Sequence, residues 1–154
     1  MYRQVLALAL LAASAMPASA QVKMQWASSN SDTGATLTFG VPETDESIIS
    51  FTCDKGKEMV LVSSYIGSKG LKADDSARII LTAGKVKKEL AGKAVANEEN
   101  GAVDVEAGAK MGDVKALLGT GKMLGIETKG VKQQVVLTGA PEAFGAFEAA
   151  CKAN

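Results

Sequence analysis

Residues 47–53, Ser-Ile-Ile-Ser-Phe-Thr-Cys, form the stretch that decides the fold of this chain. Ile49, Phe51 and Cys53 alternate in it with the polar residues Ser50 and Thr52. Successive side chains of a β-strand point to opposite faces of the sheet, so this alternation predicts a strand. Cys53 is therefore expected on the buried face of that strand.

Cys151 is the second of two cysteines in the sequence. Phe144 and Phe147 precede it at the i, i+3, i+7 spacing of a single helical face. A helix that begins at Pro141, a favoured first helical residue, would direct Cys151 toward the core. Both sulfur atoms would then face the same interior. In an oxidising compartment we predict a disulfide between Cys53 and Cys151.

Short segments with strand character recur between turn residues along the rest of the chain. They predict strands at 22–27, 35–41, 47–53, 58–64, 77–83, 85–90, 102–106, 122–128 and 131–138. A further helix is predicted at 112–118, with Asp113 as its N-cap and Gly119 as its stop. The fold class is therefore mainly β, an antiparallel β-sandwich or open barrel with two short helices. The disulfide would tie the C-terminal helix to a strand.

The first residues of the chain predict export. Arg3 precedes a short apolar run, and small residues lead to Ala20 before Gln21, which is the pattern of a cleavable signal peptide. The apolar run is shorter than the roughly 20 residues that cross a bilayer as a helix. We expect residues 1–20 to be removed and residues 21–154 to form a single β-rich domain, periplasmic or secreted, without membrane insertion.

The composition narrows the range of chemistry. Seventeen lysine and arginine residues balance seventeen acidic ones, so no net charge attracts the chain to nucleic acid. The sequence contains no histidine, which excludes a Ser-His-Asp triad and histidine-based zinc sites. A disulfide would also occupy both thiols. We therefore expect a non-enzymatic protein with no cofactor, no metal and no nucleic acid partner.

Two acidic stretches are the predicted partner-contact loops. The first contains Glu43, Asp45 and Glu46, and the second contains Glu98 and Glu99. Neither stretch has the alternating oxygen ligands and central glycine of a calcium-binding loop. We interpret both as solvated turns that are acidic enough to meet a basic protein surface.

A basic patch surrounds one predicted hairpin and consists of Lys85, Lys87, Lys88 and Lys93. It lacks the interleaved aromatic residues on which a single-stranded nucleic acid would stack. Exposed lysines also discourage the pairing of a sheet edge with another chain. We interpret the patch as protection of an edge hairpin.

Three parts of the chain together resemble a pattern found in small periplasmic proteins of α-proteobacteria. They are Trp26, the stretch that runs from Phe39 to Cys53, and the tail from Leu137 to Lys152. The chain is also faintly similar to the invasion-associated locus B family, whose members are exported β-rich proteins linked to host interaction. Both resemblances imply export and a β-rich fold, and neither supplies catalytic residues.

The leading hypothesis is a non-enzymatic binding or accessory module that contacts another envelope or extracellular protein, as a monomer or weak dimer. Two alternatives remain open. One is a small inhibitor of a hydrolase, with residues 42–47 and 97–100 as rigid inserting loops. The other is a small-ligand carrier with an apolar cavity between sheets.

Overall fold

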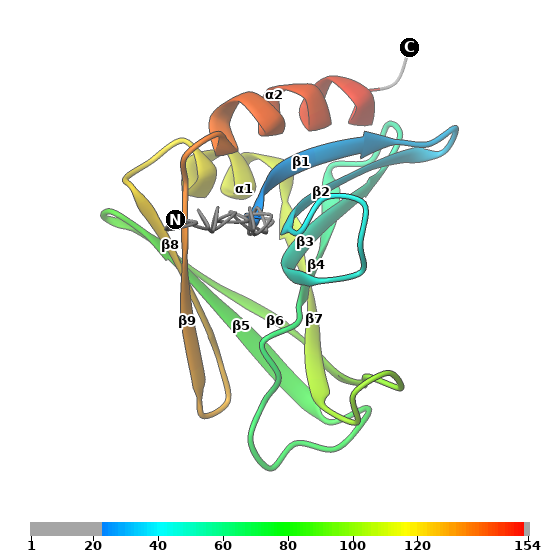
Figure 1. Ribbon diagram of the computed structural model, residues 1–154, viewed down its shortest axis with the longest axis vertical. Coiled ribbons are helices and arrows are strands. Elements are labelled where there is room, and N and C mark those ends of the chain that lie inside the picture. Colours follow the sequence, from blue (N-terminus) through cyan, green and yellow to red (C-terminus); the bar gives the residue numbers. More distant parts are fainter. Residues whose placement is uncertain (1–22, 153–154) are drawn as a thin grey trace, which may run out of the picture.

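The computed structural model describes residues 23–152, so the expected signal peptide and its cleavage site lie outside the described residues. The elements, in chain order, are β1 (Gln25–Asn30), β2 (Gly34–Gly40), β3 (Ser47–Asp54), β4 (Met59–Ser64), β5 (Ser76–Ala83), β6 (Val86–Ala96), β7 (Val103–Lys110), α1 (Met111–Leu118), β8 (Met123–Thr128), β9 (Val131–Val136) and α2 (Ala140–Cys151) (Figure 1). Within this range, neither helix has the length and apolar character needed to cross a membrane.

The described strands form one nine-stranded sheet in the order β1-β2-β3-β4-β7-β6-β5-β8-β9. Every neighbouring pair is antiparallel. The sheet curls into a half-barrel, and α2 lies across one end of it, at the top of Figure 1, packed against β1 and β2. The predicted fold class is confirmed in its open-barrel form, because one sheet curls on itself and residues 23–152 form no second sheet that packs against it.

The core lies on the concave face of this sheet, where alternating residues of each strand meet. Leu37 of β2 lies opposite Phe51 of β3, and Phe39 lies opposite Ile49; all four are buried. Complete burial of a side chain such as Phe51 contributes roughly 1.5–3 kcal/mol. The alternation in residues 47–53 therefore identifies the buried face of β3 correctly.

The predicted disulfide joins β3 to the end of α2. The Cα atoms of Cys53 and Cys151 are 5.9 Å apart, and their sulfur atoms are bonded. Phe144, Phe147 and Cys151 are all buried on one face of α2, as the spacing predicted. The amide of Gly56 donates a hydrogen bond of 2.9 Å to the carbonyl of Cys151, which gives a further link between the β3–β4 turn and the helix end.

Helix α1 begins one residue earlier than expected, and the prediction that Asp113 caps it is wrong. The N-cap is Lys110, which makes no side-chain capping bond, because β7 runs directly into the helix. Asp113 instead lies in the first turn, where a carboxylate interacts favourably with the helix dipole. Its Oδ1 atom is 2.7 Å from Nζ of Lys88.

The edge strands of the sheet are β1 and β9, so the interpretation of the lysine-rich β5–β6 hairpin as a sheet edge is wrong. Both of its strands lie inside the sheet order. The two true edges approach each other at one end. There Nε1 of Trp26 donates a hydrogen bond of 2.7 Å to the carbonyl of Val136, and the half-barrel is partly closed at that point.

Candidate functional site

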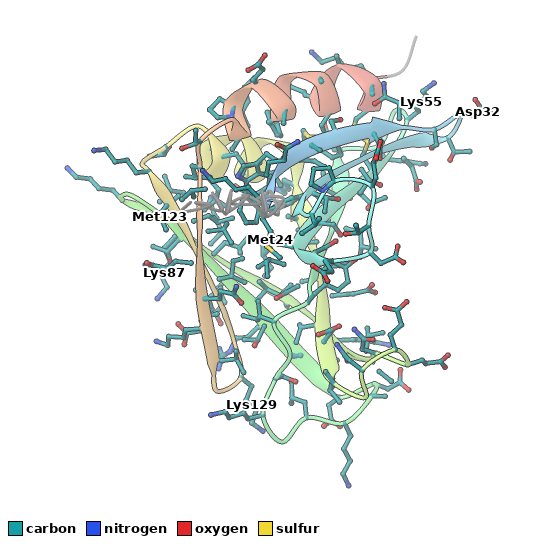
Figure 2. All side chains as sticks on the ribbon, in the orientation of Figure 1. Met24, Asp32, Lys55, Lys87, Met123 and Lys129 are labelled. Carbon is teal, nitrogen blue, oxygen red and sulfur yellow. A yellow bond between two sulfur atoms is a disulfide. The ribbon has the colours of Figure 1, made fainter. Side chains whose placement is uncertain are left out.

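Two connections form the walls of a surface groove. The β2–β3 connection, residues 41–46, and the β6–β7 connection, residues 97–102, lie on the same side of the molecule, on the right in Figure 1. Figure 2 shows side chains that end in oxygen atoms, drawn in red, on this side of the molecule. The groove has a volume of about 600 Å³. Two acidic stretches that are far apart in the sequence therefore border one depression.

The predicted contact residues are brought together here. Glu43 and Asp45 line the groove from one connection, and Glu98 and Glu99 line it from the other. Glu46 lines an adjoining depression of about 480 Å³, together with Asp45 and Glu99. The sequence identified these residues as two separate acidic turns, and the sheet order makes them opposite walls of one site.

Local hydrogen bonds hold the first wall in place. The amide of Val41 donates to the carbonyl of Glu46 at 2.8 Å. The hydroxyl of Thr44 donates to the carbonyl of Val41 at 3.0 Å and accepts from the amide of Glu46 at 3.2 Å. Glu43 adopts a φ of 61°, a left-handed conformation that is uncommon for a non-glycine residue. The backbone of this connection is thus fixed by its own bonds.

The second wall is organised by Asn97. Its amide donates to the carbonyl of Ala102 at 2.9 Å, and its carbonyl accepts from the amide of Gly101 at 2.9 Å. Its side-chain oxygen accepts from the amide of Glu99 at 3.1 Å, while Nδ2 donates to Asp104 at 2.8 Å. One asparagine therefore ties the acidic turn to the floor of the groove.

The floor contains two carboxylates outside the two predicted contact loops, Asp104 and Glu106 of β7. Asp104 is only 6% exposed, and its Oδ1 atom accepts a bond of 3.2 Å from the amide of Gly67. Glu106 accepts a bond of 3.2 Å from the hydroxyl of Ser63. In the sequence, the two carboxylates alternate with Val103 and Val105, which indicates that they lie on the opposite face of the strand but does not indicate that this face is covered.

The groove also exposes apolar surface beside its charges. Tyr65 is 41% exposed and Val95 is 37% exposed, and both line the groove. The hydroxyl of Tyr65 is 3.1 Å from the hydroxyl of Ser50, which fixes the position of the ring. A bound group can therefore meet an aromatic ring and a carboxylate in the same depression.

The charge in the groove is of one sign. Among the described lining residues there is no lysine or arginine, and there are six carboxylates: Glu43, Asp45, Glu98, Glu99, Asp104 and Glu106. The ion pairs found within residues 23–152 involve other acidic residues. In the same range, no group of acidic residues or cysteines has the arrangement needed to hold a metal ion. The site is therefore a groove with uncompensated negative charge.

Comparison with family models, curated proteins and solved structures finds no match to this chain. The fold and the groove therefore carry the functional argument.

Proposed function

We propose that the protein is a non-enzymatic binding module that receives a basic segment of another envelope or extracellular protein in the acidic groove. The observation that carries the proposal is the meeting of six carboxylates from two connections and β7 around one depression. A partner segment that carries lysine or arginine side chains at intervals would place cationic groups beside several of them.

Electrostatics favours such a partner over a neutral one. Two unit charges 4 Å apart attract by about 1 kcal/mol in water and by about 4 kcal/mol near a protein surface. The groove carboxylates have no ion-pair partners within the described residues, so a bound cation gains this attraction without first displacing an internal one. The groove is a surface site, so salt should weaken the attraction and the rate of association should fall with ionic strength.

The apolar part of the groove supports the same kind of partner. Lysine and arginine carry long methylene stems that pack on apolar surface while the charged group stays in water. Tyr65 offers a ring face and Val95 an aliphatic surface beside the carboxylates. A cation over the Tyr65 ring would add roughly 0.5–1 kcal/mol at an exposed site.

The compartment of the partner follows from the expected export of this chain. The signal-peptide pattern in residues 1–20 predicts a periplasmic or secreted protein, and the Cys53–Cys151 disulfide is consistent with an oxidising compartment. The proposed partner is therefore an envelope or extracellular protein with an accessible basic segment.

The two alternatives have less support. An inhibitor inserts a projecting loop into an enzyme, whereas the two acidic connections line a concave groove that receives a segment. A small-ligand carrier needs an apolar cavity, whereas the concave face of the sheet is packed with fully buried side chains that include Phe51, Leu37 and Phe147.

Peptide binding tests the proposal. A fluorescently labelled peptide of alternating lysine and serine should bind at low ionic strength, and its fluorescence anisotropy gives the affinity. The double variant Glu98→Gln, Glu99→Gln should weaken binding by about tenfold, which corresponds to about 1.4 kcal/mol. The matched control is Asp32→Asn with Glu142→Gln, which changes the net charge equally at two positions away from the groove. Equal losses in both variants, or no binding at low ionic strength, would overturn the proposal.

A further inference from the structure

The sheet is split between β5 and β8. β5 pairs with β6 along its whole length, from Ser76 to Ala83. It pairs with β8 only from Ile80 to Thr82. Residues 76–79 therefore have a neighbouring strand on one side only. Figure 1 shows β5 diverging from the β8–β9 hairpin toward the turn of that hairpin.

The pairing register determines which backbone groups face the split. Ala83 and Val86 are the paired residues that flank the two-residue turn of the β5–β6 hairpin. In such a turn, the main-chain N–H and C=O groups of the flanking pair bond to each other, so those of Ala83 point toward β6. At the other end, the carbonyl of Asp75 accepts a bond of 2.9 Å from β6. Because the main-chain groups of successive residues point to opposite sides of a strand, the N–H and C=O groups of the odd-numbered residues of β5 bond to β6. The N–H and C=O groups of Ser76 and Arg78 therefore point into the split.

These backbone groups have no partner within residues 23–152. The ladder with β8 ends at Ile80, and none of the hydrogen bonds outside the regular elements involves the main chain of Ser76 or Arg78. An unpaired strand edge is a template for another extended chain, and proteins normally shorten or cover it. Here the open edge consists of the main-chain groups of two residues, Ser76 and Arg78. This length is enough to bind a short extended segment and too short to pair with a long strand.

The split opens into a cleft of about 930 Å³. Apolar side chains line part of this cleft, and they come from Leu71, Ala77, Ile80 and Ala91. Leu71 belongs to the connection between β4 and β5, and the other three belong to β5 and β6. Strand addition uses both features: main-chain hydrogen bonds supply affinity, and pockets beside the strand select alternate side chains.

The charges of the cleft favour an acidic segment. Nη1 of Arg78 is 2.6 Å from Oε1 of Glu89, and Nζ of Lys132 is 3.0 Å from Oε2 of Glu127, so these charges are compensated. Lys129 lines the cleft at the turn of the β8–β9 hairpin (Figure 2) and has no ion-pair partner among the described residues. A carboxylate on a bound segment would compensate it.

We propose that residues 76–79 of β5 form a strand-addition site for an extended segment of another polypeptide that carries an acidic residue beside Lys129. Ser76 and Arg78 supply two N–H donors and two C=O acceptors to the segment. At about 3.3 Å per residue, three or four residues of the segment span this edge. The site uses different elements from the acidic groove and prefers the opposite charge, so it goes beyond the function proposed above.

A capped hexapeptide of alternating valine and threonine with one aspartate is a direct probe of this site. At millimolar peptide, the amide resonances of Ser76 and Arg78 in the ¹⁵N-labelled protein should shift. The same peptide with its aspartate replaced by lysine should bind more weakly. A counterpart methylated on alternate backbone nitrogens cannot pair with the edge and should not shift these resonances. Unchanged resonances with the unmodified peptide would overturn the proposal.

Two variants at one position separate the backbone from the side chain. Arg78→Pro removes the N–H group that points into the split and leaves the bonds from β5 to β6 intact, because the amide of Arg78 does not take part in them. Arg78→Ala removes the side chain and keeps the N–H. Loss of one hydrogen bond should make the proline variant bind the hexapeptide about tenfold more weakly than the alanine variant. Equal affinities would refute strand addition.

The methylated peptide gives the same test on the unaltered protein if the proline variant fails to fold. The lysine–serine peptide serves as the control for the other site, because it should bind both Arg78 variants like the wild type. Failure of the hexapeptide alone refutes the strand-addition site, whereas failure of the lysine–serine peptide alone refutes the acidic groove.

Discussion

Replacing Cys53 and Cys151 together by alanine should lower the free energy of unfolding by about 4.7 kcal/mol. The bridge joins residues that are 98 positions apart in the sequence. In the chain-entropy model, cross-linking a loop of that length removes about this much conformational free energy from the unfolded chain. Phe51 and Phe147 lie close to the bridge in sequence and would still hold β3 and α2 in the core. The loss is therefore expected to act mainly through the unfolded state.

Urea unfolding followed by tryptophan fluorescence measures this change. Trp26 is a suitable reporter because its ring centroid lies 5.3 Å from that of Phe39 and 6.2 Å from that of Phe51 in the core. With a slope of about 2 kcal/mol per molar urea, the midpoint should fall by about 2 M. Reduction of the wild-type protein should give the same midpoint as the double variant, and a reductant should leave the double variant unchanged.

Three outcomes would contradict this reasoning in different ways. Equal midpoints for the oxidised and reduced wild-type protein would mean that the bridge does not constrain the chain. A midpoint shift below about 0.5 M would mean that the unfolded chain gains little freedom when the bridge is lost. If the urea midpoint fell strongly in the double alanine variant but did not fall when the wild-type protein was reduced, the loss of stability would come from the cavities left by the missing sulfur atoms.

Three further substitutions test the packing of the sheet. Trp26→Phe removes the hydrogen bond to Val136 and keeps a ring in the core, so circular dichroism during urea unfolding should show a loss of about 1 kcal/mol. Gly92→Ala would place a Cβ atom 1.8 Å from the carbonyl oxygen of Glu106, so strands β6 and β7 would have to separate. Calorimetry should show that the free energy of unfolding falls by about 3 kcal/mol. An unchanged melting temperature would contradict the close approach. Lys88→Ala removes a partly exposed ion pair and should change the free energy of unfolding by less than about 1 kcal/mol in the same assay.

The inward faces of the strands and the disulfide could be predicted because both depend on local spacing. Alternation in residues 47–53 placed Cys53 inward, and the helical spacing from Phe144 to Cys151 placed the second sulfur inward. Strand ends were harder to predict. The sequence pattern predicts a strand at 85–90, but β6 continues past Gly92 to Ala96. The close approach of Glu106 requires a glycine there, and the same glycine interrupts the apolar pattern in the sequence.

Strand order could not be predicted, because it depends on contacts between segments that are distant in the chain. Without the strand order, the sequence alone does not show that the lysine-rich β5–β6 hairpin lies inside the sheet or that the two acidic turns lie together. The order β3-β4-β7-β6 explains the groove. In an antiparallel sheet, the starts of β3 and β7 and the ends of β4 and β6 lie at one end. Both acidic connections attach at that end, so the walls of the groove meet there.

The same strand order forces a long crossing that links the two proposed sites. From the end of β4 the chain must pass β7 and β6 to begin β5, and residues 65–75 make this connection. Its Gly67 donates its amide to Asp104 in the floor of the groove at 3.2 Å and accepts a bond of 2.6 Å from the hydroxyl of Thr128 in the cleft. Two residues later, the amide of Lys69 donates to the carbonyl of Lys129 at 2.7 Å. One connection thus supports the floor of the acidic groove and the far wall of the split, which makes the geometry of each site depend on the same short stretch of backbone.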